Sequence, residues 1–225
     1  MIKFGTDGWR AVLGEEYTLP NVRRVAWAVG QYFKERGFKK GILVGFDRRT
    51  LSPEASDAAA QIFAHLGIPT WKMTAPFPTP GISFGVKHLG ADLGVIITSS
   101  HNPPNWNGFK IKESSGAPAS TETTQAVEKW IPQAPADIAE GKFTVDPARI
   151  SSVDFKALYV QMLTESVDWK VIQTARPHVI IDYMHGSGAS ILGEILKSKG
   201  VEYQELRGNH DTTFGGVAPE PLEKI

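Results

Sequence analysis

The sequence contains no cysteine. Disulfide bridges and thiolate metal sites are therefore excluded, although this absence leaves the cellular compartment open. The chain also lacks a run of about 18 apolar residues of the kind that spans a membrane, and the first residues, MIKFGTDGWR, hold no apolar stretch of signal-peptide length. We therefore expect no membrane partner and a cytoplasmic location.

An excess of either charge is absent as well. The 24 Lys and Arg residues balance the 24 Asp and Glu residues. No run of about five or six like charges is present that would bind a polyanion by releasing counterions, so we expect no nucleic-acid partner. The histidines form no pair at the spacing of about three to five residues that is typical of zinc ligands, which argues against a histidine metal site.

The chain does have the length and apolar content for folding: 225 residues, of which 41% are hydrophobic, suit two domains. Apolar runs at residues 41–47, 68–73 and 93–98 predict strands. Helical patterns lie before and between them, and are expected at residues 22–33, 52–66, where Ser52 is the expected N-cap, and 79–89, which Gly90 closes. This alternation predicts an α/β fold, a three-layer αβα sandwich around a mixed, mostly parallel sheet.

The pattern loosens near the middle of the chain and then repeats. We expect a first domain at residues 1–133 and a linker, rich in proline and small residues, at residues 134–150. A partial second domain follows at residues 151–225, where Ser151 and Asp154 are expected to form a capping box before a helix. The run HVIID then opens a second strand, helix, strand unit, so the first pattern is repeated in an incomplete form.

The stretch TSSHNPPNWNGFKI (residues 98–111) follows the third apolar run directly. Its two prolines push the preceding residues away from helical geometry, so the chain turns at once and displays hydroxyls where α/β sheets gather ligands. Ser100 there is a candidate nucleophile or phosphate carrier, and His101 and Lys110 are candidates for proton transfer and positive charge. We expect Asn107 and Gly108 to form a tight turn that brings Lys110 back.

Two other interpretations of this stretch are open. It is also what an ordinary polar loop is made of. A Ser-His hydrolase is disfavoured because adjacent residues rarely place the imidazole on the neighbouring hydroxyl, and no G-x-S-x-G elbow is present.

The same stretch closely resembles the phosphoserine loop of the α-D-phosphohexomutases, whose usual form is T-[AS]-S-H-N-P followed by N-G-x-K. FGTDGWR is similar to the family's G-T-x-G-x-R segment, VGFDRR to its V-G-x-D-x-R strand end, and PFPTPG to its P-T-P turn. DYMHGSGA and FGGVAPEP resemble later segments of the family. The resemblance thus runs in order along nearly the whole chain.

The resemblance implies interconversion of hexose 1-phosphate and hexose 6-phosphate, of glucose, mannose or both, through a phosphoserine and a 1,6-bisphosphate. It implies Mg²⁺ on the serine phosphate, glucose 1,6-bisphosphate as activator and a hexose phosphate as substrate. The residues it implies fall into three groups, which are catalytic Ser100, His101, Lys110 and Arg10; substrate-binding Thr6, Arg10, Arg49, Ser99 and Asn102; and Ser100, through its phosphate, as a metal ligand.

The chain departs from the family in lacking the magnesium loop D-G-D-x-D-R, the sugar-reading G-E-x-S-G-H loop and the phosphate clamp R-x-S-x-T-E-P. We expect an inactive amino-terminal fragment whose partner domains, III and IV, are missing. Tryptophan at position 9, where phosphoglucosamine mutases more often carry isoleucine, favours glucose or mannose phosphates. The alternatives are a fragment of a phosphoglucosamine mutase and a non-catalytic module that binds a sugar phosphate or a protein. Both cations also have a simpler, non-catalytic interpretation. Arg10 would be a surface cation, and Lys110 would be an exposed lysine on a strand.

Overall fold

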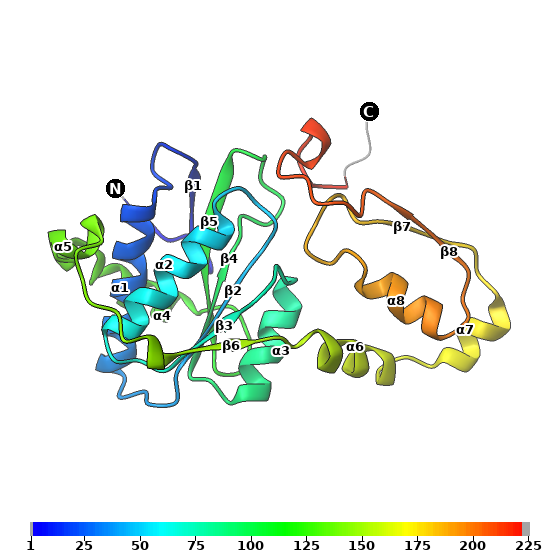
Figure 1. Ribbon diagram of the computed structural model, residues 1–225, viewed down its shortest axis with the longest axis horizontal. Helices are drawn as coiled ribbons and strands as arrows, with labels where there is room; N and C mark the ends of the chain where they lie inside the picture. Colours follow the sequence, from blue (N-terminus) through cyan, green and yellow to red (C-terminus); the bar gives the residue numbers. More distant parts are fainter. Residues whose placement is uncertain (1, 222–225) are drawn as a thin grey trace.

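A computed structural model of the chain describes residues 2–221; residues 222–225 of the expected second domain lie outside the described part. The first unit is built on a six-stranded sheet in the order β1-β5-β4-β2-β3-β6 (Figure 1). β5 runs antiparallel to both of its neighbours, whereas the other pairings are parallel, so the predicted mixed, mostly parallel sheet is confirmed. The strands are β1 (Gly8–Val12), β2 (Ile42–Phe46), β3 (Thr70–Met73), β4 (Leu93–Ile97), β5 (Trp106–Glu113) and β6 (Ile150–Val153).

Helices cover both faces of this sheet. α1 and α2 pack against each other on one face, and α3 packs on β2 and β4 from the other (Figure 1). Right-handed crossovers explain this, because the chain moves outward from β2 to β3 and back past β2 to β4. The helices of the first unit are α1 (Leu19–Glu35), α2 (Ser52–His65), α3 (Thr79–Leu89), α4 (Thr121–Glu128), η1 (Ile131–Gln133), α5 (Ala136–Glu140) and η2 (Pro147–Arg149).

The core of the first unit lies between these layers. All five residues of β2 and all five of β4 are buried, as their continuously apolar sequences predict for strands covered on both faces. α1 buries the stripe that includes Val22, Val25 and Val29. Each large aliphatic side chain buried in this way contributes about 1.5–3 kcal/mol to folding, which holds the strand ends in fixed positions.

The second unit is smaller. β7 (Val179–Asp182) pairs in parallel with β8 (Tyr203–Leu206), and α8 (Ile191–Ser198) connects them, so the predicted strand, helix, strand repeat is present. Its other helices are α6 (Lys156–Glu165), α7 (Trp169–Ala175) and η3 (Phe214–Gly216). Within residues 2–221, no helix has the length and apolar content to cross a membrane.

Two predictions about helix ends differ in outcome. Gly90 closes α3 in a left-handed conformation with φ 63°, as expected. Ser52, the expected N-cap of α2, is wrong: Leu51 occupies that position with φ 68°, and Ser52 is the first helical residue. The Ser52 hydroxyl instead donates to Oδ1 of Asp47 at the end of β2 (2.7 Å).

The segment expected as a linker carries structure. α5 packs on α1, where Arg23 donates to the carbonyl of Ala139 (3.1 Å). Ser151 lies in β6, opposite Trp71 of β3, so the predicted capping box with Asp154 is wrong; α6 begins at Lys156, whose N–H donates to Oδ1 of Asp154 (2.8 Å). Because β6 belongs to the six-stranded sheet, we propose that the boundary between the units follows it.

Candidate active site

The chain leaves β4 through residues 98–105, which we name the serine loop. Ser100 adopts φ 56°, a left-handed conformation that residues other than glycine rarely adopt. Its N–H donates to Oγ1 of Thr98 (3.0 Å), and Asn102 N–H donates to the carbonyl of Ser99 (3.1 Å), so hydrogen bonds hold the turn on both sides. Ser100 is exposed whereas Ser99 is fully buried, and the Oγ of Ser99 has no hydrogen-bond partner among the described residues. The turn thus presents the hydroxyl of Ser100 and hides that of Ser99.

The chain returns from this loop through β5, and not through the tight turn that we expected. Asn107 and Gly108 lie inside the strand, opposite Ala11 and Arg10 of β1, so the predicted turn is wrong. A Cβ at position 108 would lie 2.6 Å from the carbonyl oxygen of Thr98, so glycine allows the strand and the serine loop to approach closely.

Lys110 and Arg10 meet at a carboxylate. Nζ of Lys110 lies 2.9 Å from Oδ2 of Asp7, and a terminal nitrogen of Arg10 lies 3.8 Å from Oδ1. Arg10 also donates to the side-chain oxygen of Asn102 (3.2 Å), which ties this pair to the serine loop. Lys110 is only 9% exposed, so its interpretation as an exposed strand lysine is wrong. Thr6, which precedes Asp7 in the chain, is exposed.

Asp7 is a site residue that sequence reasoning missed. The only signal for it was an acidic residue inside GTDGWR, between glycines and ahead of the arginine. Its carboxylate faces two cations, so the group retains positive charge beside the serine loop.

His101 follows the serine and is exposed. Its Nδ1 lies 3.4 Å from Oγ of Ser100, at the long end of hydrogen-bond distances. The imidazole therefore stands beside the hydroxyl without the short contact that a Ser-His pair uses to activate a nucleophile.

Arg49 lies beneath the serine loop, with 1% of its side chain exposed. One terminal nitrogen donates to the carbonyls of Ser100 (2.8 Å) and Asn102 (2.7 Å). The other donates to the carbonyls of Pro103 (2.9 Å) and Trp106 (3.1 Å). The structure therefore brings Arg49 to the loop backbone and not to an open surface where a substrate would lie.

Asp47, at the end of β2, completes the support of the loop. Its Oδ2 lies 3.4 Å from Nε of Arg49, and its Oδ1 accepts the Arg49 N–H (2.9 Å). Burial raises the pKa of the Asp47 carboxyl above its usual range, while hydrogen bonds from Thr98 and Ser52 act in the opposite direction.

A cavity of about 350 Å³ lies between the two units at the serine loop. We name it the interunit cavity; its lining comes from both units and consists of Asp47, Arg48, Thr79, Thr98, Ser100, His101, Asp182, Tyr183, Met184, Gly186, Ser187, Phe214 and Pro219. Ser100 and His101 thus reach the same space, whereas Arg10 and Lys110 are not among its described lining residues.

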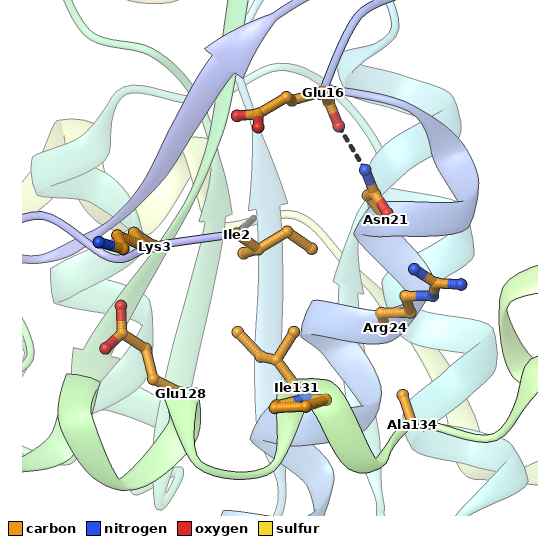
Figure 2. A pocket seen from close by; sticks show the side chains of 9 residues that line it. Ile2, Lys3, Glu16, Asn21, Arg24, Glu128, Ile131 and Ala134 are labelled. Carbon is orange, nitrogen blue, oxygen red and sulfur yellow. Dashed lines mark hydrogen bonds between the residues drawn. The ribbon is translucent and has the colours of Figure 1, made fainter.

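Figure 2 shows a second hollow, of about 590 Å³. Its described lining includes no residue of the serine loop. It is formed where the amino-terminal residues meet α1 and η1, and Ile2 faces Ile131 across it (Figure 2). Lys3 and Arg24 line it together with Glu16 and Glu128, so its charges are mixed. A net positive site for a phosphate is therefore absent from this lining.

The side chains that reach the serine loop do not form a metal cage. Within residues 2–221, no group of three His, Cys, Asp or Glu side chains is arranged to hold a metal ion. A magnesium ion in a protein is bound by carboxylate and phosphate oxygens together with water, and the described residues do not supply such a set.

Comparisons with known proteins cover most of the chain. Residues 1–136 match the family model of phosphoglucomutase/phosphomannomutase alpha/beta/alpha domain I, and residues 157–225 match that of domain II. A phosphoglucomutase/phosphomannomutase of Thermococcus kodakarensis is 29% identical over 98% of this chain and 48% of its own length. A phosphoglucosamine mutase of Sulfurovum is 30% identical over 100% of this chain and 52% of its own length.

A crystal structure from Thermus thermophilus, assigned as a phosphomannomutase, has a TM-score of 0.88 and 32% identity over 98% of this chain and 49% of that one. The chain spans about half the length of the curated relatives that it matches. Both family models match in sequence order, and together they cover most of the chain. The chain belongs to the phosphoglucomutase/phosphomannomutase family.

Proposed function

We propose that this chain carries the phosphoserine site of a mutase that interconverts hexose 1-phosphate and hexose 6-phosphate, of glucose, mannose or both. The observation that supports it most directly is the exposed Ser100 hydroxyl on a left-handed turn, at a cavity that both units line. Family membership supports the class of reaction.

In this proposal, Oγ of Ser100 carries a phosphoryl group. Transfer breaks the bond between Oγ and phosphorus while a sugar hydroxyl oxygen forms the new one; a 1,6-bisphosphate results, and its other phosphoryl group returns to Oγ. The hydroxyl proton of the sugar must go to a base, and His101 beside Oγ is our candidate.

Positive charge is the second requirement of phosphoryl transfer. Arg10 and Lys110 supply it in our proposal, and Asp7 holds them in place while the serine is unmodified. Asn102 accepts from Arg10 and so lies in the same group. Thr6 stays a proposed substrate contact; for Ser99 and Arg49, burial favours a role in supporting the loop instead.

We also propose that turnover needs parts that this sequence lacks. The described residues do not fit a magnesium cage, and the sequence has no D-G-D-x-D-R loop and no R-x-S-x-T-E-P clamp. We accordingly propose that the complete enzyme is cytoplasmic, depends on magnesium and is activated by glucose 1,6-bisphosphate. We also propose that its domains III and IV contribute to turnover.

A second candidate substrate is an amino-sugar phosphate, because relatives at similar identity are named phosphoglucosamine mutases. Tryptophan at position 9 was our reason to prefer glucose or mannose. Its side chain is buried and stacks on Tyr17 with ring centroids 5.0 Å apart, so it packs the core and does not face a sugar. Trp9 therefore gives no reason to prefer one sugar phosphate over another.

The test is site-mapped phosphorylation of the complete enzyme after incubation with glucose 1,6-bisphosphate and magnesium. We expect phosphate on Ser100 and none on Ser99. The Ser99→Ala variant is the matched control and should be labelled like the wild type, whereas Ser100→Ala should not be labelled. Phosphate on Ser99, or none on the loop, would contradict the proposal and favour a module that only binds.

A further inference from the structure

The side chain of Arg49 donates hydrogen bonds to the backbone of the serine loop and of the first residue after it. Its two terminal nitrogens point at four carbonyl oxygens, and the Ser100 carbonyl is among them. Hydrogen bonds from a charged donor are stronger than those between neutral groups. A buried guanidinium with these partners has no terminal donor left for a substrate phosphate, yet it fixes the carbonyl of the residue whose hydroxyl we propose to react.

The second unit covers this guanidinium. The Arg49 guanidinium carbon lies 4.9 Å from the ring centroid of Phe214, a buried residue of η3. The neighbouring Arg48 donates to the carbonyl of Gly208 (3.0 Å), and Nε2 of His210 lies 3.0 Å from the Arg48 carbonyl. Residues 208–214 therefore contact the Arg48–Arg49 pair three times.

We propose that Arg49 is a positioning residue for Ser100, and that Phe214 makes this positioning depend on the second unit. When residues 208–214 lie against the Arg48–Arg49 pair, the guanidinium stays desolvated and the serine loop keeps the left-handed turn at Ser100. When they move away, water reaches the guanidinium and weakens its hold on the loop carbonyls. The catalytic part of this inference rests on the proposed function, whereas the effect on loop order does not.

Amide hydrogen exchange of the 225-residue chain tests the effect on loop order. Within residues 99–106, three amides have hydrogen bonds, on Ser100, Asn102 and Trp106. Phe214→Leu keeps an apolar side chain but removes the ring; losing a cation–π contact of about 1 kcal/mol should speed their exchange by about 5-fold. Phe214→Tyr restores the ring and should restore wild-type exchange.

Two further variants complete this experiment. Tyr203→Leu removes a ring from β8, where it packs on the small core of the second unit, and is the matched control: it should leave exchange in the serine loop unchanged. Arg49→Lys keeps the charge but loses the planar fork, so exchange of the same amides should rise by about 10-fold or more. Faster exchange in Phe214→Leu that is confined to residues 208–221 would overturn the coupling between the units.

A catalytic measurement separates positioning from mere stability. In the complete enzyme, Phe214→Leu should lower kcat by about 5-fold with KM unchanged. The proposed substrate contacts Thr6, Arg10 and Asn102 keep their side chains, and leucine keeps the apolar wall that Phe214 gives the interunit cavity. Phe214→Tyr should recover kcat. If Ser100 takes up phosphate but kcat of Phe214→Leu equals that of the wild type, the positioning role is wrong. If Ser100 takes up no phosphate while loop exchange still responds to Phe214→Leu, the proposed function fails and the coupling stands.

Discussion

The two units differ in how completely they bury their sheets. In the first unit, six strands have helices on both faces and the strands at the centre are fully buried. In the second, β7 and β8 rest on a core of Ile181, Leu196 and Val201, while Ile180 is 66% exposed and Leu206 49% exposed. Two strands alone are at best marginally stable. The serine loop therefore stands on the more completely buried unit, while the thinner second unit contributes the other wall of the interunit cavity.

The largest effect should come from removing the hydroxyl on the rigid unit. We expect Ser100→Ala to abolish turnover of the complete enzyme, since Thr98 and Ser99, the other hydroxyl residues of the serine loop, are buried. The free energy of unfolding should stay within about 0.5 kcal/mol of the wild-type value, as is usual for an exposed side chain. Mutase kinetics and chemical denaturation measure the two quantities. Residual turnover within about 10-fold of wild type would place the phosphate carrier elsewhere.

The next prediction concerns the chain with these two units alone. The 225-residue chain alone should fold but should not convert glucose 1-phosphate to glucose 6-phosphate, because the aspartates of the magnesium loop and the second phosphate clamp are absent. Circular dichroism checks folding, and a coupled assay with magnesium and glucose 1,6-bisphosphate checks activity. Turnover near the enzyme-typical range of about 1–10³ s⁻¹, with full-length mutase excluded by mass spectrometry, would show that the two units suffice without the magnesium loop and the second phosphate clamp.

Charge beside the serine loop should have a smaller effect than the hydroxyl. Replacing Lys110 or Arg10 by methionine should lower kcat/KM by about 10²-fold, the scale for losing one charge-stabilising donor. Steady-state kinetics of the complete enzyme measures it. Lys3→Met, which removes a cation at the hollow of Figure 2, is the control and should leave kcat/KM unchanged. If both site variants keep activity within twofold of the wild type, Lys110 and Arg10 have a structural role and do not act in catalysis.

The difference in burial itself can be tested with a pair of matched truncations. Ile96→Ala in β4 should lower the free energy of unfolding of the first unit by about 2–4 kcal/mol, because the site is enclosed. Ile181→Ala in β7 should cost less, about 1–2 kcal/mol, and should speed exchange only in the second unit. If Ile181→Ala destabilises β2 and β4 equally, the units unfold as one and the comparison fails.

The smallest effect concerns Ser99. Its Oγ is buried without a hydrogen-bond partner among the described residues, so Ser99→Ala removes a desolvated polar atom and should change stability by no more than about 1 kcal/mol, toward greater stability. Thermal denaturation and mutase kinetics measure this, with activity expected within twofold. A large loss of activity would mean that Ser99 Oγ gains a partner during the reaction.

Local patterns in the sequence predicted most of the fold. Apolar runs marked β2, β3 and β4, and Gly90 marked the end of α3, because these features depend on neighbouring residues. β6 escaped prediction because its pairing with β3 joins residues that are far apart in the chain. The turn predicted at Asn107 and Gly108 was wrong, because pairing with β1 overrides the turn preference of these two residues.

The candidate site was predictable only in part. The serine loop was identified from its motif, and Lys110 and Arg10, which the resemblance implied as site residues, both lie at the Asp7 carboxylate. The position of Arg49 was not predictable, since backbone carbonyls carry no signal in the amino-acid sequence. Asp7 escaped for a similar reason, because its role comes from meeting Lys110, which is distant in the sequence.

The left-handed backbone at Ser100 also bears on which amino acids this position tolerates. Threonine carries the same hydroxyl, but a β-branched residue is a conformational outlier at φ 56°. Glycine and asparagine fit the backbone and lack the hydroxyl. Serine is left as the alcohol that suits both demands, so the local geometry, and not phosphate chemistry alone, decides between the two aliphatic hydroxyl amino acids at this position.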